Sequence, residues 1–315
     1  MLIETDTKEY RQHFPFSPNP YISEQFLDLV KGKADSIVRL IEDQVKVSIG
    51  LVAGIRDQVL ISAFSSPFGG FHFLHNNIFT SEIDKFLSKL ISYTASQNLK
   101  AIKISLPPDI YHQSFNSKIA NSLLRNGFSM DIPEITNWVD LKKFSGEFSC
   151  RNTKRNYNQS LRHKLSFQQV FTASEKEAAY NIVCLNRLRL GYPIYMTFAD
   201  FQETGKLWPV DFFQVRSQKD DVVAAAIFYR GHPTIVQGIY WGDSVHGRRF
   251  RAMDFCSLNL WNHYKNLDFE FIDLGISSES GFPKNGLVRF KEDIDCISGL
   301  RLCFTLNLTH AHRIN

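Results

Sequence analysis

The sequence has little cysteine and no paired-cysteine motif. Its five cysteines are scattered over 315 residues, and no two of them are spaced as in C-x-x-C. An odd number of widely spaced cysteines supports neither a disulfide framework nor a zinc site. The pattern favours a reducing compartment, so we expect a cytoplasmic protein without a metal cofactor.

Long apolar runs are also missing. No stretch of about 18 apolar residues occurs, and the first 19 residues are mixed and charged. We therefore expect no membrane span and no export signal. The net charge of +4 is small for a dedicated nucleic-acid binder but suits local binding of an anion. An apolar content of 43% is enough for one large domain or two ordinary ones.

The phosphate-binding glycine motifs are absent as well. The sequence contains neither G-x-G-x-x-G nor the Walker pattern. Gly69 and Gly70, in the aromatic segment 65–73, are then either a tight turn or a close approach of the backbone to a ligand.

The most informative stretch runs from Asp221 to Gly275. Two β-rich runs, 222–229 and 235–241, flank the turn 230–233 and predict a hairpin. A helix with one buried stripe follows, and 269–274 returns as a strand parallel to its predecessor. The stripe consists of Phe250, Met253, Ser257, Trp261 and Tyr264.

The first half of the chain repeats this order. A proline-rich and aromatic arm over residues 1–20, carrying Phe14, Phe16 and Pro18, precedes it. A hairpin over 45–64, a helix from Thr80 or Ser81, and a strand over 101–106 then follow in the same sequence. This order favours an internal duplication, with two α/β halves each built on a mixed sheet and bounds at 1–147 and 148–315.

A basic segment lies between the halves. Residues 148–174 contain no acidic residue but carry Arg151, Arg155 and Arg162 on one side of a predicted helix. Tyr157, Leu161 and Leu165 fall on another side. The basic side is either a solvated helix face or a clamp for a phosphate-bearing ligand or a tRNA backbone, since guanidinium groups bind phosphate through two hydrogen bonds.

Four features of the second half carry a family resemblance. They are the basic helix RNTKRNYNQSLRHK, the strand pair with a polar turn, the helix beginning in SVHGRRFRAMDF and the closing LGISSESGFPKNGLVRFKEDI. Together they resemble the acyl-CoA N-acyltransferase (GNAT) superfamily, in particular its FemAB-like branch. The GNAT pyrophosphate loop usually reads Q/R-x-x-G-x-G/A, whereas 246–252 keeps only a glycine and a small residue in a basic setting.

The resemblance implies an α/β (α+β mixed sheet) fold with two tandem GNAT-like domains. It also implies acyl transfer to an amine. The donor would be acetyl-CoA, another acyl-CoA or an aminoacyl-tRNA, and the acceptor an amino group of a sugar, peptide or cell-envelope precursor.

Acyl transfer to an amine needs a grip on the donor and a stabilised oxyanion. Gly247 before a helix N-terminus, with its neighbouring arginines, would hold the donor phosphates. Gly238 is either a bulge that frees a backbone N–H for the carbonyl or a packing glycine. The arginines are Arg248, Arg249 and Arg251.

The remaining site candidates are less determined. Lys291 matches the lysine that in FemAB-like relatives faces the reaction channel, but it also suits a surface position. The candidate bases are Asp273, Glu279 and His246, unless the amine loses its proton to water. Tyr240 and Trp241 line either an acceptor cleft or the core, and Arg151 and Arg155 are candidate substrate contacts.

Two other classes of function compete with an enzyme. The weak pyrophosphate loop favours a non-catalytic GNAT-like module that binds a phosphorylated ligand or a protein. A nucleic-acid binder would show a basic surface with stacking aromatics, whereas the basic residues here are concentrated in one helix and one turn.

Overall fold

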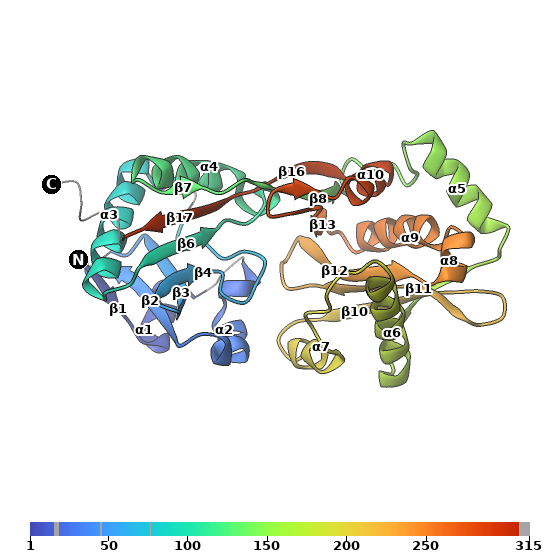
Figure 1. Ribbon diagram of the computed structural model, residues 1–315, viewed down its shortest axis with the longest axis horizontal. Coiled ribbons are helices and arrows are strands. Elements are labelled where there is room, and N and C mark those ends of the chain that lie inside the picture. The colour runs from blue at the N-terminus through green and yellow to red at the C-terminus, as the bar shows by residue number, and fades with distance from the viewer. Residues whose placement is uncertain (16–18, 45, 76, 309–315) are drawn as a thin grey trace. The chain divides into compact units, whose positions relative to one another are not determined.

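A computed structural model describes residues 1–15, 19–44, 46–75 and 77–308 (Figure 1). Contacts divide the chain into two compact units. The first comprises Met1–Ile135, Glu279–Phe282 and the described residues from Gly299 onward, and the second comprises Thr136–Ser278 and Pro283–Ser298. Each unit is built on one mixed sheet.

The sheet of the first unit has the order β1-β2-β3-β4-β6-β17-β7, with β5 added to β3. Its only parallel pair among the described residues is β4 with β6, and β17 lies antiparallel to β6 although it is about 200 residues away along the chain. The strands are β1 (Leu2–Glu4), β2 (Ser36–Glu42), β3 (Ile49–Arg56), β4 (Val59–Ser62), β5 (Phe71–Phe73), β6 (Ala101–Ser105), β7 (Ser129–Met130) and β17 (Cys303–Asn307). The helices are α1 (Thr7–His13), α2 (Glu24–Val30), α3 (Thr80–Ser96) and α4 (Asp109–Arg125), with short 3₁₀ turns at Pro20–Ile22 and Lys31–Lys33.

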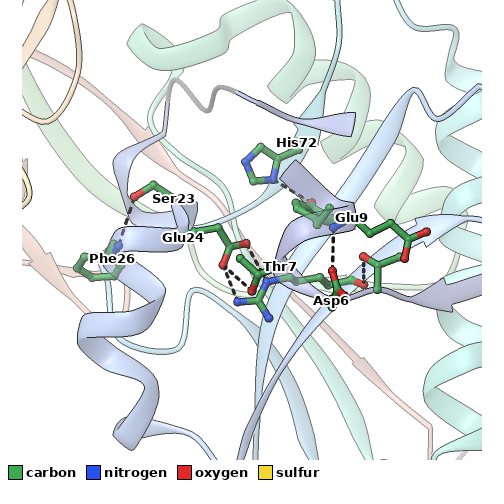
Figure 2. Close-up of polar contacts among 10 residues, drawn as sticks. Asp6, Thr7, Glu9, Ser23, Glu24, Phe26 and His72 are labelled. Atoms are coloured by element: carbon green, nitrogen blue, oxygen red, sulfur yellow. Dashed lines mark hydrogen bonds and ion pairs between the residues drawn. The ribbon is translucent and has the colours of Figure 1, made fainter. Parts of the chain in front are cut away.

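The N-terminal segment is not the extended arm that its prolines predict. It forms β1 and α1, and Tyr10 on α1 is only 1% exposed. Asp6 caps α1 because its carboxylate accepts a hydrogen bond from the N–H of Glu9 (Figure 2). Phe16 and Pro18 of the predicted arm lie outside the described residues.

Polar pairs fasten α1 and α2 to the first sheet. Arg39 donates to both carboxylate oxygens of Glu24, at 2.8 and 2.6 Å (Figure 2). Tyr10 Oη and His72 Nδ1 share a hydrogen bond of 2.9 Å. Burial raises the pKa of Tyr10 and lowers the pKa of His72 to about 3, so both side chains are neutral in the folded protein.

The sheet of the second unit has the order β16-β8-β13-β12-β11-β10-β9. Its strands are β8 (Glu134–Asp140), β9 (Ser166–Val170), β10 (Val210–Arg216), β11 (Val222–Tyr229), β12 (Ile235–Asp243), β13 (Phe271–Ile276) and β16 (Ile297–Arg301). Its helices are α5 (Arg151–Leu161), α6 (Ala173–Arg189), α7 (Phe198–Thr204), α8 (Val245–Arg249), α9 (Ala252–Asn266) and α10 (Asn285–Asp293). The short strands β14 (Ser278–Glu279) and β15 (Phe282–Pro283) pair with each other.

Strand β11 shows why this sheet carries helices on both faces. Ala224, Ala226 and Phe228 belong to the core that includes α9. Ala225 and Ile227 belong to the core of α6 and α7. Alternate residues of a strand point to opposite faces, so α9 covers one face and α6 with α7 the other (Figure 1).

The hairpin, the helix and the parallel return strand predicted for the second half are confirmed as β11–β12, α9 and β13. Of the three apolar residues predicted on one side of the basic helix, Tyr157 and Leu165 pack against the core that includes α9, although Leu165 lies beyond the end of α5. Leu161, the last residue of α5, is 48% exposed, and the buried residues of this helix are Thr153 and Ser160. Among the described residues no helix is both long and apolar enough to cross a membrane.

The neutral state of His72 predicts a loss of stability in acid. The unfolded chain binds a proton below about pH 6.5, whereas the folded protein resists protonation of His72 down to about pH 3. Between pH 7 and pH 5 the free energy of unfolding should therefore fall by about 2 kcal/mol through this residue. Urea titrations of wild type and His72→Gln at both pH values measure this term, and an equal pH dependence of the two proteins would contradict it.

Candidate functional site

Two parallel strands of the second sheet part from each other in mid-course. Strands β12 and β13 pair from Ile235–Phe271 to Gln237–Asp273. Beyond that point β12 runs on to Asp243 and β13 to Ile276, and the described residues supply no strand between them. We call this divergence of β12 and β13 the opening. It lies at the carboxyl ends of two parallel strands, which is where ligands bind in open α/β sheets.

A β-bulge in β12 lies directly after the last paired residue. On the β11 side, Phe228 pairs with Gly238 and Ile227 with Tyr240, so Ile239 is the extra residue. Gly238 is also tightly packed, because an added Cβ would lie 3.0 Å from Leu274 and 3.1 Å from the ring of Phe228. The two interpretations of this glycine, bulge and packing, therefore coincide.

The last paired residues of the two strands are joined by buried polar side chains. Gln237 Nε2 donates to Asp273 Oδ2 over 3.1 Å, and Asp273 is 1% exposed. Asp273 Oδ1 accepts a hydrogen bond of 2.8 Å from the backbone N–H of Gly275. Gly275 has a φ of +67°, in the region that favours glycine, and it turns the end of β13.

Lys291 of α10 binds the end of β13. Its Nζ donates to the carbonyl oxygens of Leu274, Gly275 and Ile276 at 2.9, 2.9 and 3.1 Å, and the residue is 1% exposed. Burial lowers the pKa of Lys291 to about 8, so the ammonium form still predominates at pH 7. An ammonium has three N–H donors, and these three carbonyls use all of them.

The basic turn before α9 contains a glycine with a steric role. Gly247 is buried, and an added Cβ would lie 2.0 Å from the carbonyl oxygen of Val223. Its N–H already donates to Ser244 Oγ over 3.0 Å, which caps α8. Phosphate contacts at this turn would therefore come from its exposed guanidinium groups, which belong to Arg248, Arg249 and Arg251.

Tyr240 and Trp241 lie on opposite faces of the sheet. Tyr240 is 6% exposed and belongs to the core of α6 and α7, where its hydroxyl accepts hydrogen bonds from the N–H groups of Tyr195 and Met196. Trp241 packs on the other face, with ring centroids 6.1 Å from Trp261 and 5.5 Å from Phe290. A cleft on one face of the sheet could therefore be lined by only one of these two rings.

The other candidates are exposed. Arg151 and Arg155 project from α5, and His246 lies on α8. Glu279 is exposed in β14 and belongs to the first compact unit. Within the described ranges no group of three or more His, Cys, Asp or Glu side chains could hold a metal ion.

The structure adds polar residues that the sequence patterns missed. Asp243, at the end of β12, accepts from Arg189 at 2.8 Å and from Asn186 at 3.1 Å. Burial raises the pKa of Asp243, and the charges of Arg189 and Arg248 counteract this rise. The available signal was a polar residue inside an apolar strand, and the same signal marks Gln237.

Comparisons with known proteins rest on structure rather than sequence. No protein-family profile and no curated protein sequence matches the chain. The structure of FemX matches 99% of this chain and 98% of its own at a TM-score of 0.70 and 11% identity. The chain has a tandem GNAT, FemAB-like fold.

Two further structures share the tandem GNAT fold. The C-terminal domain of a putative lysylphosphatidylglycerol synthetase from Agrobacterium fabrum has a TM-score of 0.61 at 9% identity, covering 98% of this chain and 94% of that one. A tandem GNAT protein from the clavulanic acid biosynthesis pathway has a TM-score of 0.53 at 8% identity, covering 98% of both chains. At these identities the likeness concerns the fold alone.

The steric role of Gly247 in the tandem GNAT fold predicts the effect of a single methyl group. Gly247→Ala should lower the free energy of unfolding by about 2 kcal/mol or more, because the new Cβ would meet the backbone of Val223. Gly286→Ala in α10 meets nothing within 4 Å, so it should be neutral or stabilise by about 0.5–1 kcal/mol. Thermal denaturation of both variants checks this, and equal melting temperatures would contradict it.

The contacts of Lys291 predict that its first role is to hold the end of β13. Lys291→Met should lower the free energy of unfolding by about 1–3 kcal/mol, since it leaves buried carbonyls unsatisfied. Lys219→Met, at an exposed position, should change it by less than about 0.5 kcal/mol. Denaturant titration at pH 7 measures both, and a fully stable Lys291→Met protein would overturn this role.

Proposed function

We propose that the protein is an N-acyltransferase that moves an acetyl, other acyl or aminoacyl group from a carrier to an amino group. The observation that carries the proposal is the parting of β12 and β13 beside the bulge at Gly238 and Ile239. Backbone groups of β12 beyond Gln237 lack a strand partner on that side within the described part of the chain. Such groups are able to bind an extended carrier and polarise its carbonyl.

The chemistry needs a neutral amine and a place for the oxyanion. A bound thioester or ester carrier supplies an activated carbonyl carbon. The β12 backbone at the bulge is the proposed oxyanion donor. Lys291 would contribute through the field of its charge, because its three donors are engaged by carbonyls. Both carboxylate oxygens of Asp273 already accept hydrogen bonds inside the core. The proposed proton acceptor within the second unit is therefore the exposed His246 or water.

The donor remains open between an acyl-CoA and an aminoacyl-tRNA. Arg248 and Arg249 would hold phosphates of either one. A more extended basic surface supports the RNA alternative. It forms because α5 packs on α9 and the ring of His163, just beyond α5, lies 4.6 Å from that of Phe250. Its exposed cations are Arg151, Lys154, Arg155, Arg162, Lys164, Arg248, Arg249 and Arg251.

The acceptor is proposed to be an amino group of a sugar, peptide or cell-envelope precursor. This part rests on the fold shared with FemX and with the lysylphosphatidylglycerol synthetase domain. A non-catalytic binding module is the competing function. Two contacts favour it, because they engage groups that a catalytic site would use. The Gly247 N–H donates to Ser244 Oγ, and the Lys291 ammonium donates to backbone carbonyls.

The double substitution Arg248→Ala/Arg249→Ala tests donor binding. It should raise the donor dissociation constant by on the order of 10- to 100-fold, since it removes charge-assisted contacts to phosphate. Both residues are exposed, so the melting temperature should not change. Calorimetric titration with acetyl-CoA, CoA and aminoacyl-tRNA measures the constant.

The matched control is Lys142→Ala/Lys143→Ala, which removes two exposed cations elsewhere in the second unit. It should leave donor binding unchanged. An unaltered constant in the arginine variant would count against the phosphate site. Binding of any donor without transfer to amine acceptors would favour the non-catalytic module. A steep fall of affinity with salt would identify the RNA donor.

A further inference from the structure

The end of α6 and the loop after it display large apolar side chains to solvent. We call residues 185–195 the apolar segment. Soluble proteins rarely leave so many large apolar side chains exposed within one short run, and such surfaces mark interaction sites. The exposed fractions are 59% for Leu185, 75% for Leu188, 49% for Leu190, 41% for Ile194 and 78% for Tyr195.

Contacts of Arg187 and Tyr180 hold the apolar segment in place. The guanidinium of Arg187 lies 4.5 Å from the ring centroid of Tyr240 and 5.8 Å from that of Tyr192. Its Nε donates to the carbonyl oxygen of Pro193 over 2.8 Å. Tyr180 Oη donates to the carbonyl oxygen of Met196 over 3.0 Å. The loop is therefore fastened at several points, and the exposure of its apolar side chains is a property of its folded conformation.

Most backbone N–H groups of the loop after α6 already have hydrogen-bond partners. The N–H groups of Leu190, Gly191 and Tyr192 donate to carbonyl oxygens at the end of α6. The N–H of Tyr195 and that of the next residue donate to Tyr240 Oη, and Pro193 has no N–H. Moving a loop into a poorly hydrated environment is expensive when its polar groups lose water without gaining partners. These N–H groups therefore add little to that penalty.

The charged residues within and beside the apolar segment are basic. No acidic residue occurs between positions 178 and 199, where the only charged residues are Arg187 and Arg189. Arg189 and Arg248 both act on the carboxylate of Asp243, which places the basic turn near the end of α6. The neighbouring Val245 is a further exposed apolar residue, at 57%.

We propose that the apolar segment docks this protein on an anionic lipid surface. Leucine, isoleucine and tyrosine side chains would enter the boundary between head groups and acyl chains, and the nearby arginines would face the phosphates. This inference goes beyond acyl transfer and does not depend on it. A protein partner is the less favoured occupant, because the apolar side chains lie beside arginines and no acidic residue occurs between positions 178 and 199, a combination that suits anionic head groups.

The test is co-sedimentation of the full chain with vesicles of phosphatidylcholine, alone or mixed with phosphatidylglycerol, at about 0.15 M salt. Wild type should bind the mixed vesicles, and Leu188→Ser/Tyr195→Ser should lower the partition coefficient on the order of tenfold. These substitutions leave the charge unchanged, so attraction between the basic surface and the vesicles contributes equally to both proteins.

The matched control is Leu74→Ser/Phe79→Ser, which removes two side chains of the first unit that are 48% and 74% exposed. It should bind vesicles as wild type does. Wild type that ignores anionic vesicles, or a Leu188→Ser/Tyr195→Ser protein that binds them equally well, would overturn the proposal. Light scattering that finds a wild-type dimer and a variant monomer would instead assign the segment to self-association.

Discussion

A strand that leaves its neighbour inside a core must find other partners for its backbone, and here a buried ammonium supplies them. Strand β13 stops pairing with β12 after Asp273, and its register with β8 shifts at the same place, between Asp273 and Ile276. Leu274 and Gly275, which lie between these positions, are paired with neither strand. Lys291 binds three of the carbonyls at this turn, so the β13 side of the opening is stabilised by hydrogen bonds.

The opposite wall of the opening is shaped by different means. Strand β12 carries the bulge at Ile239, and Gly238 allows the strand to approach Phe228 and Leu274. The contact between Gln237 and Asp273 marks the last joined position of the two strands. A polar pair at this depth is stable only because its hydrogen bonds are made, so it also fixes the register in which the strands part.

The local part of this architecture could be predicted from the sequence. Alternating apolar residues and a polar turn predict β11 and β12, and a stripe at helical spacing predicts α9. The rest depends on distant partners. Gly247 has the signature of a phosphate-binding glycine, yet its constraint is the carbonyl of Val223, more than 20 residues earlier. The return of β17 to the first sheet and the carbonyl partners of Lys291 are likewise absent from any local pattern.

The hydrogen-bond donors that are already engaged limit how the proposed site could act. Lys291 has no fourth N–H to offer, so a direct hydrogen bond to an oxyanion would require it to release a carbonyl of the β13 turn. The Gly247 amide is similarly committed to Ser244. Rigid backbone would therefore face the reacting carbonyl at β12, while long arginine side chains would face the phosphates. A site of this kind would constrain the acyl carbon closely and leave the phosphate-bearing part of the carrier adjustable, which suits either of the two proposed donors, an acyl-CoA or an aminoacyl-tRNA.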